Sequence, residues 1–274
     1  MYDQLLQGLA NAVNAAAIGL MTEDSVDLNA LRNSGMTWQS TASLIYHLLS
    51  GAPPSPSVPA STTSTSSSSV VPVVPSPTGQ AYLFRFRDEE EPEDPIEVSP
   101  LVSEALPGVV DSPRLFQHLF KVGRVRPQVN RTSSGVYSAM KQICGVAMYN
   151  LALSLHVAAY RSRGNTSPSS ILIEGAKNAY IEATDLLEGL DLSPDGTLIF
   201  AFMAACNNLA EISTNVLAVE ETKRLVITAL WSIPPAQESR IYTYFALLSH
   251  VYAQEIGETP PLPLTELVSV ATTK

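Results

Sequence analysis

The stretch MYNLALSLH at residues 148–156, followed by the triplet Ala176, Tyr180 and Ala183, decides the fold class of this chain. In the first stretch, apolar side chains and the small residue Ala152 follow one another in the order found in the first helix of a repeated helix hairpin. The triplet has the small, aromatic, small order of a second helix. Small residues at such positions let two helices approach closely, and stacked hairpins bury a continuous core. Together these features predict an all-α fold of antiparallel helix hairpins.

The same pattern recurs on both sides of this hairpin, as in a tetratricopeptide-like superhelix. The following hairpin repeats it with Ala210, Thr222, Val226 and Ala229. A degenerate copy nearer the N-terminus consists of Ala42, Tyr46 and Leu49. A non-repeating helical bundle would bury the same residues, so both interpretations stay open at this point.

Apolar periodicity and chain breakers set the expected helix bounds. Helices are predicted at about 5–22, 28–49, 135–162, 168–190, 195–215, 219–232 and 237–256. A further short helix is expected from Ser112, because Ser-Pro is typical of a helix start. Its apolar stripe would consist of Leu115, Phe116, Leu119 and Phe120.

Composition divides the chain into five regions. An N-terminal helix hairpin is expected at 1–50, and 51–79 is a linker in which 20 of 29 residues are Ser, Thr or Pro. Such a segment buries too little apolar surface to offset its ordering entropy, so it is predicted to be disordered. Residues 80–111 form an extended and acidic insert. Within it, the aromatic and apolar stretch 81–87 predicts either a short strand, with which Ile96–Val98 could pair, or an ordered extended segment docked on the helices. The helical core covers 112–258, and a flexible tail covers 259–274.

Charge and hydropathy limit the kinds of partner. The formal net charge is -10, which argues against nucleic acid and against a polybasic membrane anchor, because both need clustered Lys and Arg. The longest uninterrupted apolar run, Leu198–Cys206, is far shorter than the ~20 residues that span a bilayer. With no basic region before the apolar N-terminus, the chain is expected to be soluble and intracellular, in the cytoplasm or nucleus.

Residue patterns for catalysis and for metal binding are not found. The two cysteines lack CxxC spacing, and none of the four histidines lies within four residues of another histidine or of a cysteine. No nucleophile elbow, dinucleotide fingerprint or P-loop occurs. We therefore expect no catalytic, cofactor-binding or metal-binding residue and no enzymatic activity; an enzyme of unrecognised type is a remote alternative.

The most informative polar pair is Asn207-Asn208, which lies inside an apolar helix. Buried amides need hydrogen-bond partners, because leaving one unpaired costs roughly a few kcal/mol of folding free energy. Two interpretations follow: the amides clamp backbone groups of a neighbouring helix or of a docked extended segment, or they line a groove and bind the backbone of a partner. Asn150 and His156 are the other candidate partner-binding residues.

Two stretches resemble a family of tetratricopeptide-like proteins that is abundant in diatoms and uncharacterised. They are residues 148–153 with His156, and ACNNLAEI at 205–212. The resemblance covers about 10–50 and 110–256, and it implies a fold without an activity or a ligand. The chain lacks the Trp-Leu-Gly-Tyr consensus of a strict repeat and has long loops, which leaves the repeat number open.

These features favour a scaffold or adaptor that binds a protein or peptide through its helix pairs. An obligate structural or regulatory subunit of a larger complex is the alternative. It is favoured by a charged fraction of 15%, because free surfaces are usually more charged. No partner can be named from the sequence.

Overall fold

The computed structural model describes residues 2–22, 85–86, 96–100, 114–125, 133–161, 166–188, 191–192, 198–231, 233 and 240–259. Three predicted regions therefore lie wholly or mainly outside the described residues: the second N-terminal helix at 28–49, the Ser/Thr/Pro linker and the C-terminal tail.

The described part of the chain is mostly helical, as predicted, and it also contains small sheets. Its helices are α1 (Tyr2–Thr22), α3 (Ser133–Arg161), α4 (Thr166–Leu187), α5 (Leu198–Ile212), α6 (Val216–Trp231) and α7 (Arg240–Ile256). The predicted bounds of α3 to α7 agree with these to within three residues. Apolar residues and breakers thus located these helices correctly; α6 buries one face in the core, whereas α5 is buried all round from Leu198 to Ala210.

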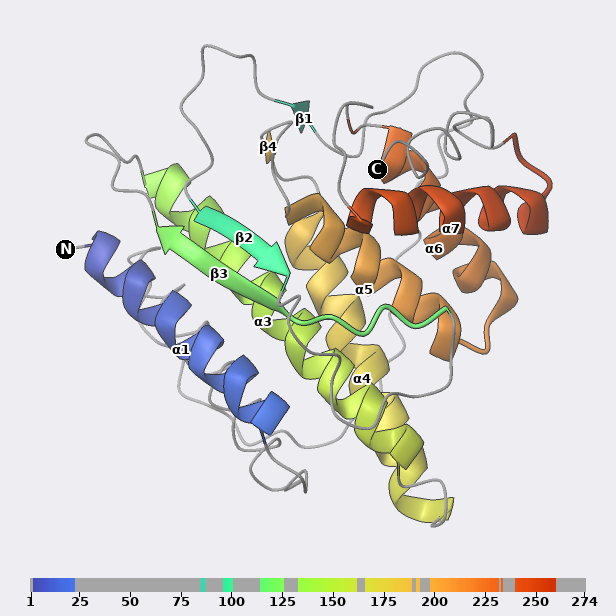
Figure 1. Ribbon diagram of the computed structural model, residues 1–274, viewed down its shortest axis with the longest axis horizontal. Coiled ribbons are helices and arrows are strands. Elements are labelled where there is room, and N and C mark those ends of the chain that lie inside the picture. Colours follow the sequence, from blue (N-terminus) through green and yellow to red (C-terminus); the bar gives the residue numbers. More distant parts are fainter. Residues whose placement is uncertain are drawn as a thin grey trace, which may run out of the picture.

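Consecutive helices from α3 to α7 pack against one another along the chain. Alternate helices also touch, since α1 packs on α3, α3 on α5 and α5 on α7 (Figure 1). We call α1, α3, α5 and α7 the alternate row. This row positions the side chains of the candidate site.

Close packing of α3 on α4 depends on small residues. A Cβ atom added to Gly145 would lie 2.6 Å from Cγ of Leu187, closer than carbon atoms approach. The residues of the repeat pattern that the structure describes are all buried, Thr222 and seven others, whereas Ala42, Tyr46 and Leu49 lie outside the described residues. The seven others are Ala152, Ala176, Tyr180, Ala183, Ala210, Val226 and Ala229.

Helix α3 is the central element of the core. Its stretch Val136–Tyr160 is long and apolar enough to cross a membrane by length and composition alone, with a mean hydropathy of 1.4. However, 83% of the most apolar 18 residues of that stretch are buried inside the fold. Packing against α1, α4, α5 and the strands accounts for its apolar character.

Two small sheets accompany the helices. β2 (Ile96–Pro100) pairs antiparallel with β3 (Phe120–Val125), and β1 (Arg85–Phe86) pairs parallel with β4 (Asp191–Leu192). The predicted pairing of Ile96–Val98 with 81–87 is therefore wrong for Arg85 and Phe86, the two residues of that stretch that the structure describes. Buried Ile96 and Val98 of β2 instead face the buried valines 125 and 122 of β3, which gives both strands an apolar face.

The predicted helix from Ser112 is also wrong over its described residues. Arg114–Leu119, which we call the held segment, is extended and leads directly into β3. The held segment and β3 together cross the alternate row from α7 to α1 (Figure 1). Side chains from distant helices satisfy its backbone, so it does not need the internal hydrogen bonds of a helix.

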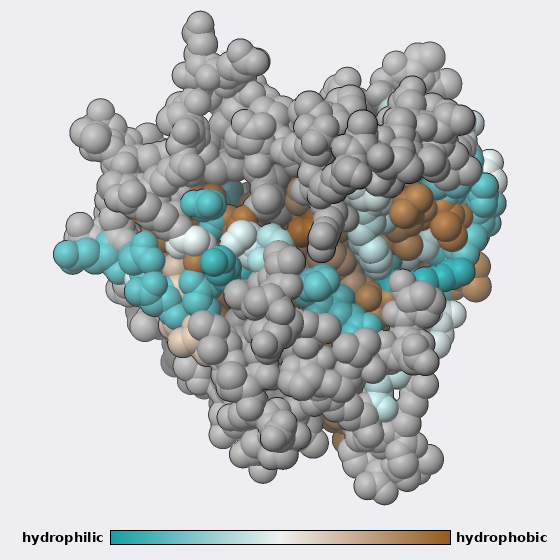
Figure 2. Space-filling view, in the orientation of Figure 1, coloured by the Kyte–Doolittle hydropathy of each residue, from teal (hydrophilic) through white to brown (hydrophobic). Residues whose placement is uncertain are grey.

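Not all apolar side chains are covered. Leu247 and Val251, one turn apart on α7, are 47% and 39% exposed, and Val216 and Leu217 at the start of α6 are more exposed still. Figure 2 shows a hydrophobic patch over α7. The last helix pair therefore presents an apolar surface.

Candidate functional site

Asn208 on α5 binds both backbone groups of a single residue in the held segment. The N–H of Phe116 donates to Oδ1 of Asn208 at 2.9 Å, and Nδ2 of Asn208 donates to the carbonyl of Phe116 at 2.9 Å. This pairing reproduces what a neighbouring β-strand would supply. The Asn208 amide is completely buried, and bonds to Asn207 and Tyr180 use its remaining donor and acceptor capacity.

Two further asparagines make the same paired contact with β3. Asn150 on α3 accepts from the N–H of Phe120 at 2.9 Å and donates to its carbonyl at 2.7 Å. Asn14 on α1 accepts from the N–H of Val122 at 2.8 Å and donates to its carbonyl at 2.6 Å. Three helices of the alternate row thus each contribute one asparagine to one continuous extended backbone.

Hydroxyl groups and a fourth asparagine complete these contacts at the α7 end. The carbonyl of Arg114 accepts from Nδ2 of Asn207 at 2.7 Å and from the hydroxyl of Tyr244 at 2.9 Å. The hydroxyl of Tyr149 donates to the carbonyls of Phe116 and His118. These contacts fall on every second residue, because alternate backbone groups of an extended chain point the same way.

The spacing changes at a bulge in β3. Two residues of β2, Ile96 and Val98, lie opposite Val125 and Val122, so β3 contains one extra residue between its paired positions. Beyond the bulge, the N–H of Val125 points toward α1 and donates to Oε1 of Gln7 at 3.2 Å. α1 therefore holds the strand on both sides of the bulge.

Behind the asparagines lies a chain of polar groups within the core. The hydroxyl of Tyr252 donates to Oδ1 of Asn207 at 2.7 Å, and Tyr180 links Asn208 to Nδ1 of His156. Burial raises the pKa of Tyr180 and of Tyr252, so both hydroxyls stay protonated and available as donors. His156 is buried behind Tyr180, and its place in the chain of contacts orients that hydroxyl.

Aromatic side chains line the position of Phe116. Its ring stacks on Phe245 with centroids 5.3 Å apart, and it lies 5.4 Å from the ring of Tyr244. Phe120 also stacks on it, with centroids 5.8 Å apart. Phe116 therefore occupies a slot formed by α7 and by the first residue of β3.

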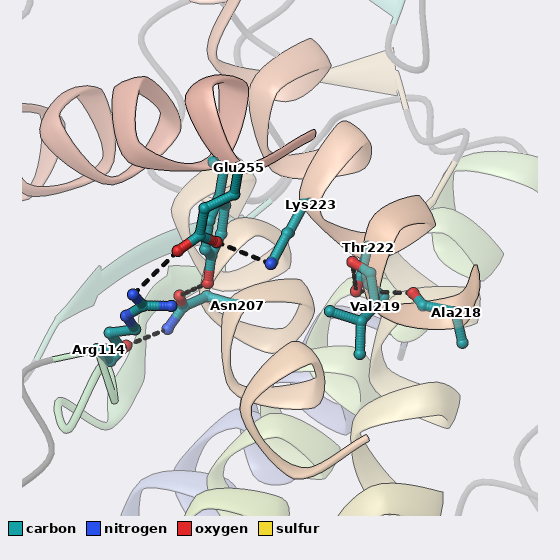
Figure 3. Close-up of polar contacts among 8 residues, drawn as sticks. Arg114, Asn207, Ala218, Val219, Thr222, Lys223 and Glu255 are labelled. Atoms are coloured by element: carbon teal, nitrogen blue, oxygen red, sulfur yellow. Dashed lines mark hydrogen bonds and ion pairs between the residues drawn. The ribbon is translucent and has the colours of Figure 1, made fainter. Parts of the chain in front are cut away.

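Charged residues gather at the start of the held segment. The guanidinium of Arg114 forms an ion pair with Glu255 of α7 at 2.9 Å, and Lys223 of α6 binds the same carboxylate at 2.8 Å (Figure 3). Burial acts to raise the pKa of Glu255, but the hydrogen bond and charge of Lys223 and the charge of Arg114 bring that pKa below its usual value. Burial raises the pKa of nearby Glu211, against the charge of Arg114, which lowers it.

Two further observations concern the chemistry of the described residues. The described residues contain no group of three or more His, Cys, Asp and Glu side chains placed to hold a metal ion. Both cysteines are buried and free. Burial raises the pKa of Cys144 to about 11 and raises that of Cys206 as well, so neither thiol is ionised near neutral pH.

The sequence pointed to Asn150, Asn207 and Asn208, and the structure brings all three onto the held segment and Phe120. Gln7, Asn14 and the three tyrosines at 149, 244 and 252 were missed. A signal for the first two existed, because Gln7 and Asn14 are two helical turns apart beside an apolar stripe.

Comparison with protein-family models, with curated proteins and with solved structures found no match for this chain.

Proposed function

We propose that this chain is a non-catalytic protein-interaction scaffold whose alternate row of helices binds an extended segment of another protein. The observation that carries the proposal is the set of three asparagines, 208, 150 and 14, each of which binds the N–H and C=O of one residue. Side chains that satisfy a strand backbone in this way form a surface for extended peptides.

The hydrogen bonds to the held segment do not depend on the identity of its side chains. They go to Arg114 C=O, to the N–H and C=O of Phe116 and to His118 C=O. Every residue type supplies the carbonyls, and every type except proline supplies the N–H. Another extended chain can therefore receive the same bonds. We propose that a partner segment takes the place of residues 114–119, while β3 stays paired with β2.

The arrangement of helices supports a tetratricopeptide-like superhelix as part of this proposal. In such a fold, the first helix of each hairpin contacts the first helix of the next, and these helices line the binding face. The contacts from α1 to α3, α5 and α7 follow that order, and α4 and α6 have the place of second helices. The proposed partner is a protein, since Glu211 and Glu255 at one end of the site disfavour a phosphate backbone.

Fluorescence polarisation with a labelled octapeptide of residues 112–119, SPRLFQHL, tests the proposal on the full chain. Phe116→Ala weakens the held segment and is expected to increase binding of the probe by about tenfold or more over the wild type. Adding Tyr149→Phe, which removes two hydrogen bonds to the backbone, is expected to reduce that gain. A folded Phe116→Ala chain that does not bind the probe would contradict the proposal.

A second candidate function is supported by the exposed apolar residues of the last helix pair. Leu217 and Leu247 are 75% and 47% exposed, as expected of a face that another subunit covers permanently. An obligate subunit would self-associate when produced alone. Size-exclusion chromatography with light scattering separates the two functions, because the scaffold is expected to elute as a monomer.

A further inference from the structure

The proposed partner site makes different demands on each position of the segment that it holds, and these demands define a recognition motif. From the contacts of the held segment we infer that the partner carries, in extended form, a basic residue, an apolar residue, an aromatic residue, two variable residues and a second apolar residue. This inference rests on the proposed function, and it names the chemistry of the partner.

The basic position follows from charge. The Arg114 side chain is 46% exposed and reaches Glu255, and Glu211 also interacts with its charge. Lys223 balances one of these two carboxylates. One negative charge thus remains for the residue of the partner that occupies this position. An acidic residue there would meet Glu255 where Arg114 now pairs with it, and the charge of Glu211 would add to the repulsion.

The aromatic position follows from the slot that Phe116 fills. Phe245, Tyr244 and Phe120 surround the ring with centroid separations between 5.3 and 5.8 Å. Offset and tilted ring pairs at such separations add to the hydrophobic gain. Because Phe120 belongs to β3, it remains in place and stacks on the incoming aromatic ring.

The other positions follow from burial. Leu115 and Leu119 are buried, whereas Gln117 and His118 are half-buried, and the ring of His118 lies 5.3 Å from that of Phe116. The two leucines therefore define apolar positions, and the half-buried central pair restricts the side chain less, so that these positions are the variable ones. Backbone contacts at Phe116 and His118 exclude proline only at the aromatic position, where the N–H donates to Asn208.

Charge reversal provides the sharpest test. A full chain with Arg114→Glu places a third carboxylate beside Glu255 and Glu211, which weakens the held segment without making a cavity. We expect this chain to bind the octapeptide SPRLFQHL better than the wild type does. The same octapeptide with its Arg replaced by Glu is expected to bind at least about tenfold more weakly.

Three further probes complete the test on the Arg114→Glu chain. Replacing the Phe of the probe with Ala is expected to reduce its affinity about thirtyfold or more, as for an interface hot spot. Replacing its Gln with Ala serves as the matched control and is expected to change affinity less than about threefold. A Glu255→Arg chain is expected to reverse the preference between the Arg and Glu probes.

The outcomes separate the two proposals. If no probe binds either folded chain, the proposed function fails together with the motif. If probes bind but the Arg, Phe and Gln replacements have equal effects, the site binds extended segments and the motif is wrong. Two copies of the chain could instead exchange their held segments and form a dimer. Light scattering of the Arg114→Glu chain would detect that dimer, and its presence would overturn the inference that the partner is a separate protein.

Discussion

The held segment and β3 are successive halves of one extended stretch, yet the fold holds them differently. Along β3, one edge is paired with β2 and the other with Asn150, Asn14 and Gln7. Along the held segment, no described strand pairs with the backbone, and its hydrogen bonds come from side chains of α3, α5 and α7. β3 is therefore part of the fold, whereas the held segment resembles a bound ligand that is covalently attached.

The largest expected effect comes from removing the asparagines. Asn208→Ala leaves the N–H and C=O of Phe116 and the hydroxyl of Tyr180 with fewer partners in a buried site, so we expect a loss of about 3 to 5 kcal/mol in the free energy of unfolding. Asn14→Ala affects partly buried contacts and should cost about 1 to 2 kcal/mol. Urea denaturation measures both.

A matched control for these variants is Asn11→Ala. Asn11 is exposed and accepts a hydrogen bond only from Gln7 among the described contacts, so the change should stay within about 0.5 kcal/mol. Equal losses for the Asn208 and Asn14 variants would contradict the idea that burial distinguishes the two ends of the stretch.

The thiols test whether the held segment can leave while the helices stay packed. At pH 8 we expect Cys144 and Cys206 to react with DTNB at least about 100-fold more slowly in the folded chain than in the unfolded chain, since burial raises the pKa of Cys144 to about 11 from 9.0. The Phe116→Ala chain should give the same protection. Fast labelling of that variant would mean that the held segment is needed for helix packing, and the two halves would then not differ.

Native-state hydrogen exchange compares the halves directly. The amides of Phe120 and Val122 bind buried or partly buried asparagines within a stretch that β2 also pairs, so they should exchange only through large-scale unfolding. The opening free energy of the Phe116 amide should be lower than that of the β3 amides by about 1 kcal/mol or more, which corresponds to an opening constant about fivefold larger. The reverse order of protection would make β3 the looser half.

The smallest effect concerns the charges at the start of the held segment. The folded-state pKa of Glu255 lies below its unfolded value near 4.5, so its contribution to stability is present above that pH and is lost as the pH falls through the folded pKa. Because the pair with Arg114 is partly exposed, Glu255→Gln should cost less than about 1 kcal/mol at pH 7 and remove this part of the acid sensitivity.

For Glu211 we expect the pH dependence of stability to have the opposite sign to that of Glu255. The pKa of Glu211 is raised, chiefly by burial, so its contribution is present below pH 4.5 and is lost as the pH rises through the folded pKa. We therefore expect Glu211→Gln to raise the melting temperature at pH 7, measured by circular dichroism. A fall in melting temperature would show that the attraction to Arg114 outweighs the cost of burial.

The helices could be predicted from the sequence because each one carries its own evidence. Apolar residues recur along α3, α4 and α5 at helical spacing, and breakers such as Gly164 and Pro194 fall in the gaps between them. The need of Asn207 and Asn208 for buried partners could also be predicted, because it follows from their place inside an apolar helix.

The held segment could not be predicted, because two conformations fit its residues. Leu115, Phe116, Leu119 and Phe120 form a stripe on a helix as readily as two buried pairs on an extended chain. The choice is made by asparagines 92 and 30 positions further along the chain, which satisfy an extended backbone. Local pattern contains no information about contacts of that separation.

The regular alternation of backbone contacts has a consequence for how this stretch can vary. Arg114, Phe116, His118, Phe120 and Val122 all turn their backbone groups toward the alternate row. The helices thus fix the register of the backbone with a period of two residues. Deleting the residue at position 117 would shift this register by one for every residue before it, and would turn the backbone groups that now face the asparagines away from them. Length in this stretch is therefore more tightly constrained than identity.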